Sequence, residues 1–502
     1  MKKSIALLLA LALCAAVPLS LTGCQAEVSP LLIAIGGEPV SLDPFNVVDH
    51  LSPVIQQAIF EGLLAVEEKN TLVPRLAREF SISPDGRAIT FLLREGVQFH
   101  DGAKLDAEAV KVNFDFLLDP LNGMARRNLF AFVEDIVINS PYSITFTTTG
   151  PSFALAYYFA HPAASLKSPR ELEKRLKDSN YNLTHTAVGT GPFKLRQWYG
   201  GERLELVPNA NYWNKEALAP TGLTFFFVRE ASERLAMLKR GEVEIIYDLT
   251  SSEVEALRDY PAVRKVSLPR QELYYIGMNG DLPQFRDVRV RQALNYAVDR
   301  SWLLRALSIS GQAADGPVSP AVFGHAEQAA YTYDLAHAKE LLRQAGFARG
   351  FAVTLHTRES HIHLTTAREV ARQLSALNIR VEIVSHTAGE LFDLLASGQG
   401  VDMWVGSFIP YTGEVGEALR GDPELALSPS LEARLLYAEQ LFDLSAALAE
   451  YEEIQETLYQ EANRIFLFYP TRLAAVHTSI RGIQSSTQGV LLLRGAYRGG
   501  EE

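Results

Sequence analysis

Apolar and polar residues follow each other along the chain in patterns that predict both strands and helices. A continuous apolar run at residues 31–35 predicts a buried strand, and alternation at 89–93 and 143–148 predicts strands with one buried face. Apolar residues at helical spacing predict a helix over 52–64. A further helix is predicted after Asp106, whose side chain can cap the first turn.

Later segments predict both antiparallel and parallel strand pairing. Runs at 193–198 and 203–207 flank a Gly-Gly turn and predict an antiparallel hairpin. Residues 353–384 follow a strand–helix–strand order that is typical of a βαβ unit. Helices are predicted over 431–465, followed by a strand at 466–469. This mixture predicts an α/β protein with two lobes rather than a single barrel.

The first 24 residues have the features of a bacterial export signal. Two lysines precede an apolar run at 4–20 that is too short for a stable membrane span. The run ends in Leu21-Thr22-Gly23-Cys24, which resembles the lipobox of bacterial lipoproteins. We therefore predict a signal peptide at 1–23 and a lipid on Cys24 that holds the chain at the extracytoplasmic side of the cell membrane. A plain secretory signal with an incidental cysteine is the alternative.

The composition excludes several classes of protein. The chain has 502 residues, 47% apolar and 21% charged, which is typical of a folded protein with two or more domains. Its net charge of −12 gives no basic surface for nucleic acid. Of its two cysteines only Cys24 would survive signal removal, so no disulfide is expected. The P-loop, GxSxG, HExxH and CxxC strings are absent, and we predict neither an enzyme nor a resident cofactor.

Three segments, in this order, resemble the solute-binding proteins of bacterial ABC importers in the peptide/nickel family. The first contains Phe99-His100-Asp101-Gly102, the second joins Gly189-Thr190-Gly191-Pro192-Phe193 to Asn209-Ala210-Asn211-Tyr212-Trp213, and the third runs from Phe285 to Arg300. Together with their spacing they extend the resemblance over nearly the whole chain after the signal. Any one of them alone would be weak support, because GTGP, for example, is only a turn.

The resemblance implies a two-lobe clamp, like that of periplasmic binding proteins, which encloses a small solute and passes it to a membrane permease and its ATPases. We expect the first lobe at 24–265 plus 471–502, with an inserted subdomain at about 66–185. The second lobe would occupy 266–470. Two chain crossings between the lobes would form a hinge, and the ligand would lie between the lobes.

The solute is predicted from the positions at which this sequence differs from the family pattern. Peptide binders of this family commonly hold the ligand's amino end with an aspartate in the loop after a tryptophan; here Trp404 and Tyr411 are present, but the aspartate is missing. The sequence as a whole resembles the nickel-type branch of the family more closely than the peptide binders. Its members bind an anionic metal chelate through arginines, for which Arg126 and Arg127 are candidates because guanidinium groups suit carboxylates. His161 stands where a second family arginine is expected.

Two further candidates are placed by their position in the predicted fold. His50 follows the first strand in a loop that lines the cleft in this fold, so it is the candidate for direct contact with metal or ligand. Tyr275 lies in the strand that enters the second lobe and is predicted near the cleft. For His50 an exposed surface position, for the Arg126–Arg127 pair an exposed loop, and for Tyr275 core packing are the alternatives.

The sequence thus predicts a lipid-anchored receptor of an ABC importer that captures a nickel or other metal chelate, with oligopeptide or dipeptide binding as the alternative. Three rival classes stay open at this point. They are a hydrolase with a triad assembled only in space, a sensor lipoprotein that presents its ligand to a receptor, and a degenerate member that binds nothing tightly.

Overall fold

The computed structural model describes residues 29–499, except for 47–48, 68–70, 153, 218–220, 330, 399, 411–412, 426, 442 and 487. The predicted signal peptide, Cys24 and Tyr411 lie outside the described residues. Among the described residues no helix is both long and apolar enough to cross a membrane.

The first lobe is built on a sheet in which β1 is central. β1 pairs in parallel with β10 on one side and β11 on the other, and β9 and β8 continue the sheet as an antiparallel hairpin. The strands are β1 Leu31–Ile35, β8 Phe193–Tyr199, β9 Arg203–Pro208, β10 Leu223–Phe227, β11 Ile245–Tyr247 and β12 Val263–Pro269, and the helices are α2 Ser52–Ile59, α6 Ala231–Arg240 and α7 Ser251–Ala256. The end of the chain adds β19 Ile480–Arg481, β20 Gln484–Ser485, β21 Leu491–Leu492 and β22 Tyr497–Arg498.

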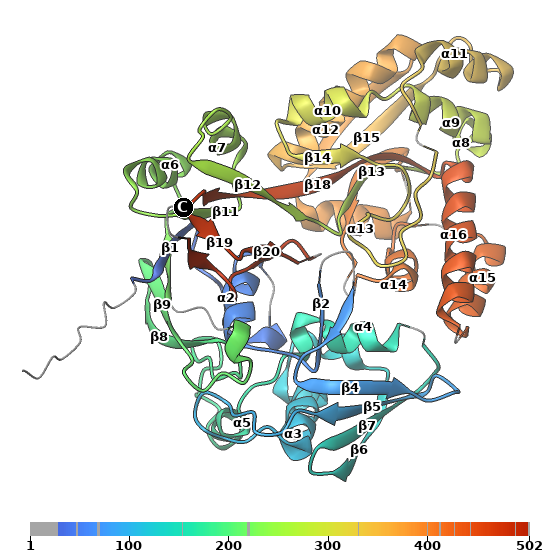
Figure 1. Ribbon diagram of the computed structural model, residues 1–502. Coiled ribbons are helices and arrows are strands. Elements are labelled where there is room, and N and C mark those ends of the chain that lie inside the picture. Colours follow the sequence, from blue (N-terminus) through green and yellow to red (C-terminus); the bar gives the residue numbers. More distant parts are fainter. Residues whose placement is uncertain are drawn as a thin grey trace, which may run out of the picture.

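The segment between α2 and β8 forms a separate layer at the bottom of Figure 1. Strands β4, β5, β7 and β6 make an antiparallel sheet, and buried phenylalanines such as Phe91, Phe114 and Phe146 pack it against α3 and α4. The elements are β2 Leu64–Val66, β3 Leu72–Pro74, β4 Ala77–Ile82, β5 Ala88–Leu93, α3 Ala107–Leu118, β6 Val133–Ser140, β7 Ser143–Thr148, α4 Leu155–Ala160 and α5 Pro169–Lys177.

The second lobe combines a mixed sheet with helices on both faces. Its strands run in the order β16-β15-β17-β13-β18, with β14 also on β18. The strands are β13 Leu273–Met278, β14 Gly311–Ala313, β15 Ala352–Arg358, β16 Arg380–His386, β17 Met403–Phe408 and β18 Arg464–His477. The helices are α8 Pro283–Arg286, α9 Val288–Tyr296, α10 Arg300–Leu307, α11 Leu335–Gln344, α12 His361–Leu374, α13 Ala388–Ser397, α14 Val415–Arg420, α15 Pro429–Glu439 and α16 Leu444–Glu461.

Strand β18 connects the two lobes, as the long red arrow in Figure 1 shows. Its first residues pair with β13 in the second lobe, and Thr471–His477 pair with β12. Its end also pairs with β11 in the first lobe. Because β12 leads directly toward β13, two antiparallel strands cross from one lobe to the other. The structure is therefore an α/β protein of two lobes; the domain boundaries that the sequence indicated stay a prediction.

Candidate functional site

A pocket of about 480 Å³ lies between the two lobes. The first lobe contributes His50, Arg126 and His161, and the second contributes Ile409 and Pro410 from the loop after β17. The other lining residues are Pro44, Asp49, Pro53, Pro162, Ala163, Tyr247, Arg270, Gln271, Arg472, Gln488, Gly489 and Val490. We call this the basic pocket, because it brings together the guanidinium groups of Arg126, Arg270 and Arg472. Its size is within the range of about 300–1,000 Å³ that is usual for small-ligand sites.

The two neighbouring arginines of the first lobe have different positions. Arg126 lines the pocket, and its backbone N–H donates to the carbonyl of Phe45 at 3.1 Å. Arg127 is turned inward, where its Nε donates to the carbonyl of Leu118 at 2.7 Å, and it is not part of the lining. Only Arg126 of the pair is therefore placed to meet a ligand in the pocket.

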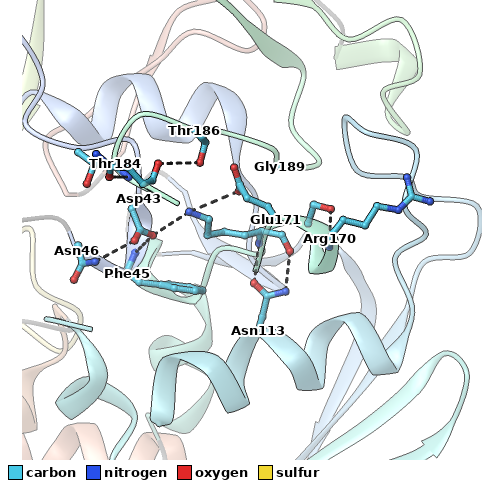
Figure 2. A network of polar contacts seen from close by, with 12 residues as sticks. Asp43, Phe45, Asn46, Asn113, Arg170, Glu171, Thr184, Thr186 and Gly189 are labelled. Carbon is cyan, nitrogen blue, oxygen red and sulfur yellow. Dashed lines mark hydrogen bonds and ion pairs between the residues drawn. The ribbon is translucent and has the colours of Figure 1, made fainter. Parts of the chain in front are cut away.

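A buried network of polar contacts supports the loop that carries Pro44 (Figure 2). The Asp43 carboxylate accepts from the Phe45 N–H at 3.1 Å and from Asn46 Nδ2 at 3.0 Å. It also accepts from the ammonium of Lys167 at 3.3 Å, and that ammonium is 3.7 Å from Glu171. Since Asn46 Oδ1 in turn accepts from the backbone N–H just before Arg126, at 2.9 Å, the network fixes the backbone at Arg126.

Charged groups also meet where the hinge strands reach the pocket. His50 Nε2 lies 3.2 Å from Asp248 Oδ2, and Arg472 Nε lies 3.4 Å from Asp248 Oδ1. Nearby, Arg270 Nη2 is 2.8 Å from a carboxylate oxygen of Glu272. Asp248 follows β11 with a φ of 61°, in the left-handed region that aspartate adopts more often than most residues other than glycine.

Burial and neighbouring charges shift the pKa values of this cluster in opposite directions. Burial raises the pKa of Glu272. For Asp248, burial alone would raise the pKa, but the hydrogen bond from His50 and the charges of Arg472 and Arg270 hold it below its usual value. Burial lowers the pKa of Arg472, and the neighbouring charge of Arg270 lowers it further. The two arginines therefore repel each other within the wall of the pocket.

A second pocket, of about 420 Å³, lies between α4 and the helices α14 and α15. Its first-lobe wall includes Phe132 and Tyr158, whereas its second-lobe wall carries Glu414, Glu417 and Glu439, together with Arg420. We call it the acidic pocket. Burial raises the pKa of Glu414 to about 7, against the hydrogen bonds that it accepts from two backbone N–H groups of α14.

Two of the candidates in the second lobe lie away from the basic pocket. Tyr275 is fully buried, with its hydroxyl donating to Glu424 at 2.6 Å and the guanidinium of Arg464 over its ring at 3.7 Å. Trp404 donates its indole N–H to the same Glu424. Neither lines the basic pocket, so Tyr275 has the core position that was the alternative to cleft contact.

His161 lines the basic pocket and also a smaller adjoining one of about 80 Å³. Its Nδ1 accepts from the Ala163 N–H at 3.0 Å, so it caps the short 3₁₀ helix Pro162–Ala164. His50, the candidate for metal contact, has Asp248 as an acidic neighbour. Among the described residues no three His, Cys, Asp or Glu side chains are grouped so that they could hold a metal ion.

Sequence reasoning missed Arg270 and Arg472. The two residues are far apart in the chain and meet only through the pairing of β12 with β18. No local pattern marks them, because each is a single arginine in or beside a strand. The two arginines could have been found only if the pairing of the two crossing strands had been predicted.

A family model, Bacterial extracellular solute-binding proteins, family 5 Middle, matches residues 71–420. The glutathione-binding protein GsiB of Salmonella paratyphi A is 31% identical over 457 residues, which cover 87% of this chain and 86% of that protein. Among solved structures, HbpA2 of Haemophilus parasuis matches with a TM-score of 0.85 at 21% identity, over 94% of this chain and 100% of that one. DppA of Helicobacter pylori, an ABC transporter-associated periplasmic binding protein in complex with the peptide STSA, matches with a TM-score of 0.73 at 23% identity, over 94% and 99%.

The chain therefore belongs to the family 5 bacterial extracellular solute-binding proteins. The predicted family and two-lobe fold are confirmed. The family is one of solute receptors rather than enzymes. The comparisons give no support to nickel as the solute and favour the peptide alternative.

Proposed function

We propose that this protein captures a short peptide or a peptide-like molecule such as glutathione in the basic pocket and delivers it to a membrane permease driven by ATPase subunits. The GsiB relative is named for binding glutathione, and the DppA structure holds a peptide. The observation that carries the proposal is the basic pocket itself, which both lobes line and which contains three guanidinium groups.

The chemistry of the pocket suits a molecule with free carboxylates. Arginine presents a planar fork of N–H donors that forms two parallel hydrogen bonds with a carboxylate. The one carboxylate of the lining itself, Asp49, already accepts from the backbone N–H groups of Leu51 and Ser52, at 2.7 and 2.8 Å. It therefore competes little for the arginines. Ile409 and Pro410 add apolar surface for the ligand from the second lobe.

We propose Arg126, His50 and His161 as ligand-contacting residues, since all three line the basic pocket. Closure about β12 and β18 would bring the loop after β17 onto the bound peptide. The proposal includes the lobe boundaries near residues 265 and 471 and the lipid anchor at Cys24, which would keep the receptor near its permease.

The metal chelate is the weaker candidate for this pocket. A chelate presents carboxylates to arginines just as a peptide does, so the three arginines do not separate the two ligands. The names of the relatives separate the two candidates, because they refer to glutathione and peptides.

The test is a titration panel followed by isothermal calorimetry on protein that has been unfolded and refolded to remove bound solute. The panel contains glutathione, di- to pentapeptides, and nickel with and without histidine or citrate. We expect heat of binding with glutathione or a short peptide. A Tm shift should accompany it, because a ligand at about 100 times its Kd adds roughly 2.7 kcal/mol to the unfolding free energy. Binding only when nickel and a chelator are both present would contradict the proposal.

A further inference from the structure

Arg270 and Arg472 lie on the same face of the two strands that connect the lobes. In the antiparallel pairing of β12 with β18, Leu268 is opposite Arg472. Arg270 follows Leu268 by two residues, so along an extended chain it points to the same side. Diagonal neighbours of this kind lie about 7–8 Å apart between Cα atoms, within reach of two long side chains. Both side chains line the basic pocket.

The acidic neighbours of the two arginines engage them only in part. A guanidinium has five N–H donors. The closest approach of Arg472 to a carboxylate is 3.4 Å, through Nε to Asp248. That distance is longer than the 2.7–2.9 Å or so of a good charge-assisted hydrogen bond. Arg270 approaches Glu272 through Nη2 at 2.8 Å.

One of the two carboxylates is shared, and the other is buried. Asp248 divides its two oxygens between His50 and Arg472. Glu272 is 5% exposed, and burial raises its pKa. The side chains of Arg270 and Arg472 are 25% and 19% exposed, and they line both the basic pocket and a smaller pocket of about 180 Å³. The repulsion between two like charges in one wall of the pocket is relieved by an anion between them.

We propose that Arg270 and Arg472 form the subsite for the terminal carboxylate of the bound peptide. This inference rests on the proposed function and adds to it an orientation: the carboxyl end of the ligand lies at the hinge strands. A free terminal carboxylate, rather than the side chains of the peptide, is then what the hinge end of the pocket recognises.

The first experiment compares each probe with a form that lacks the terminal charge, in calorimetry on the wild-type protein. The pairs are glutathione with its glycyl monoethyl ester, and trialanine with its C-terminal amide. We expect the uncharged form of a pair that binds to have a Kd higher by about tenfold or more. Because this comparison uses the unaltered protein, it does not depend on how any variant folds.

The second experiment repeats the comparison on Arg270→Gln and Arg472→Gln, with Arg264→Gln as the matched control. Arg264 lies on the same strand β12 but does not line the basic pocket. We expect the two pocket variants to bind the charged and uncharged forms about equally, and Arg264→Gln to keep the wild-type preference. Thermal unfolding of each variant shows whether it is folded.

The outcomes separate the two proposals. Wild-type protein that binds acid and amide or ester equally, or variants at 270 and 472 that keep the preference, would overturn the carboxylate subsite while peptide binding stands. Loss of the preference in Arg126→Ala alone would move the subsite to Arg126 and overturn this one. Wild-type protein that binds none of the four probes would overturn the proposed function and the subsite with it.

Discussion

Two of the pockets between the lobes, the basic pocket and the acidic pocket, have opposite chemistry. In the basic pocket the charged groups belong to the first lobe and the hinge strands, and they remain partly exposed, as the 19% exposure of Arg472 shows. In the acidic pocket the carboxylates all come from the second lobe and face an aromatic wall that includes Tyr158. Glu414 there is only 4% exposed. Glu414 is therefore largely withdrawn from water, whereas Glu439 and Arg420 in the same pocket are 29% and 47% exposed.

The two pockets are nevertheless close along the chain. Tyr158 in α4 lines the acidic pocket, and His161, just after that helix, lines the basic one. In the second lobe, Pro410 lines the basic pocket and Glu414 the acidic one. This arrangement shows that the net charge of −12 says little about the cleft. Three predictions test how the burial of a charged side chain affects its contribution to stability and to binding.

The largest effect is expected from Lys167→Met. Lys167 is 0% exposed, and its removal would leave Asp43 buried without its cation. Breaking a buried pair from one side costs about 3–5 kcal/mol of unfolding free energy. Urea unfolding measures the loss, and Lys111→Met, in an exposed pair with Asp115, is the control with less than about 1 kcal/mol. A loss from Lys167→Met as small as that of the control would show that the network is dispensable.

A smaller effect is expected from Glu414→Gln, and it depends on pH. Because burial raises the pKa of Glu414 from 4.5 to about 7, the folded state holds its proton more tightly than the unfolded state. The stabilisation from that proton is complete below pH 4.5 and is lost as the pH rises to about 7, which amounts to as much as about 3 kcal/mol. Urea unfolding at pH 5 and pH 8 should therefore show a smaller drop for Glu414→Gln than for the wild type. Equal drops would mean that Glu414 titrates normally.

The smallest effects are expected from Arg126→Ala and Arg127→Ala, which should change different properties of the protein. Arg126→Ala should raise the Kd for glutathione or a short peptide at least tenfold, because a charge-assisted hydrogen bond contributes about 1.5–3 kcal/mol. Arg127→Ala should leave the Kd unchanged and lower the unfolding free energy by about 1 kcal/mol, since it removes the bond to Leu118. Calorimetry and urea unfolding on both variants check this. An equal loss of affinity in both would place Arg127 in the binding site as well.

The local elements were predicted well because their signals are local. β1 spans Leu31–Ile35 as expected, and Asp106 caps α3 by accepting from the Ala109 N–H at 2.9 Å. The βαβ unit is present, with β15 and β16 in parallel register. The strand expected at 466–469 is longer, Arg464–His477, because its second half pairs with β12 in the other lobe. Nothing in the residues near 470 shows that partner.

The lining of the basic pocket could be predicted only in part, because it depends on contacts between residues that are distant in the sequence. The family pattern places the loops of Arg126, His50 and His161 at the cleft, and all three line the basic pocket, while their contact with a ligand stays a prediction. Arg127 has the same neighbours in sequence, but the 3₁₀ turn Arg127–Phe130 directs its side chain toward Leu118. Trp404 and Tyr275 both donate to Glu424 and do not line the basic pocket, so their role in binding stays a prediction. The direction of a side chain depends on backbone geometry that the residue type does not reveal.

The position of β18 also determines when the first lobe can be completed during synthesis. The core of that lobe joins Ile33 and Ile55, near the start of the chain, to Val476 and Leu493, near its end. At a translation rate of about 5–20 residues per second, β1 would wait roughly 20–90 s before its sheet can be closed by β18. A nascent chain of this protein therefore cannot complete the core of its first lobe before Val476 and Leu493 have been synthesised.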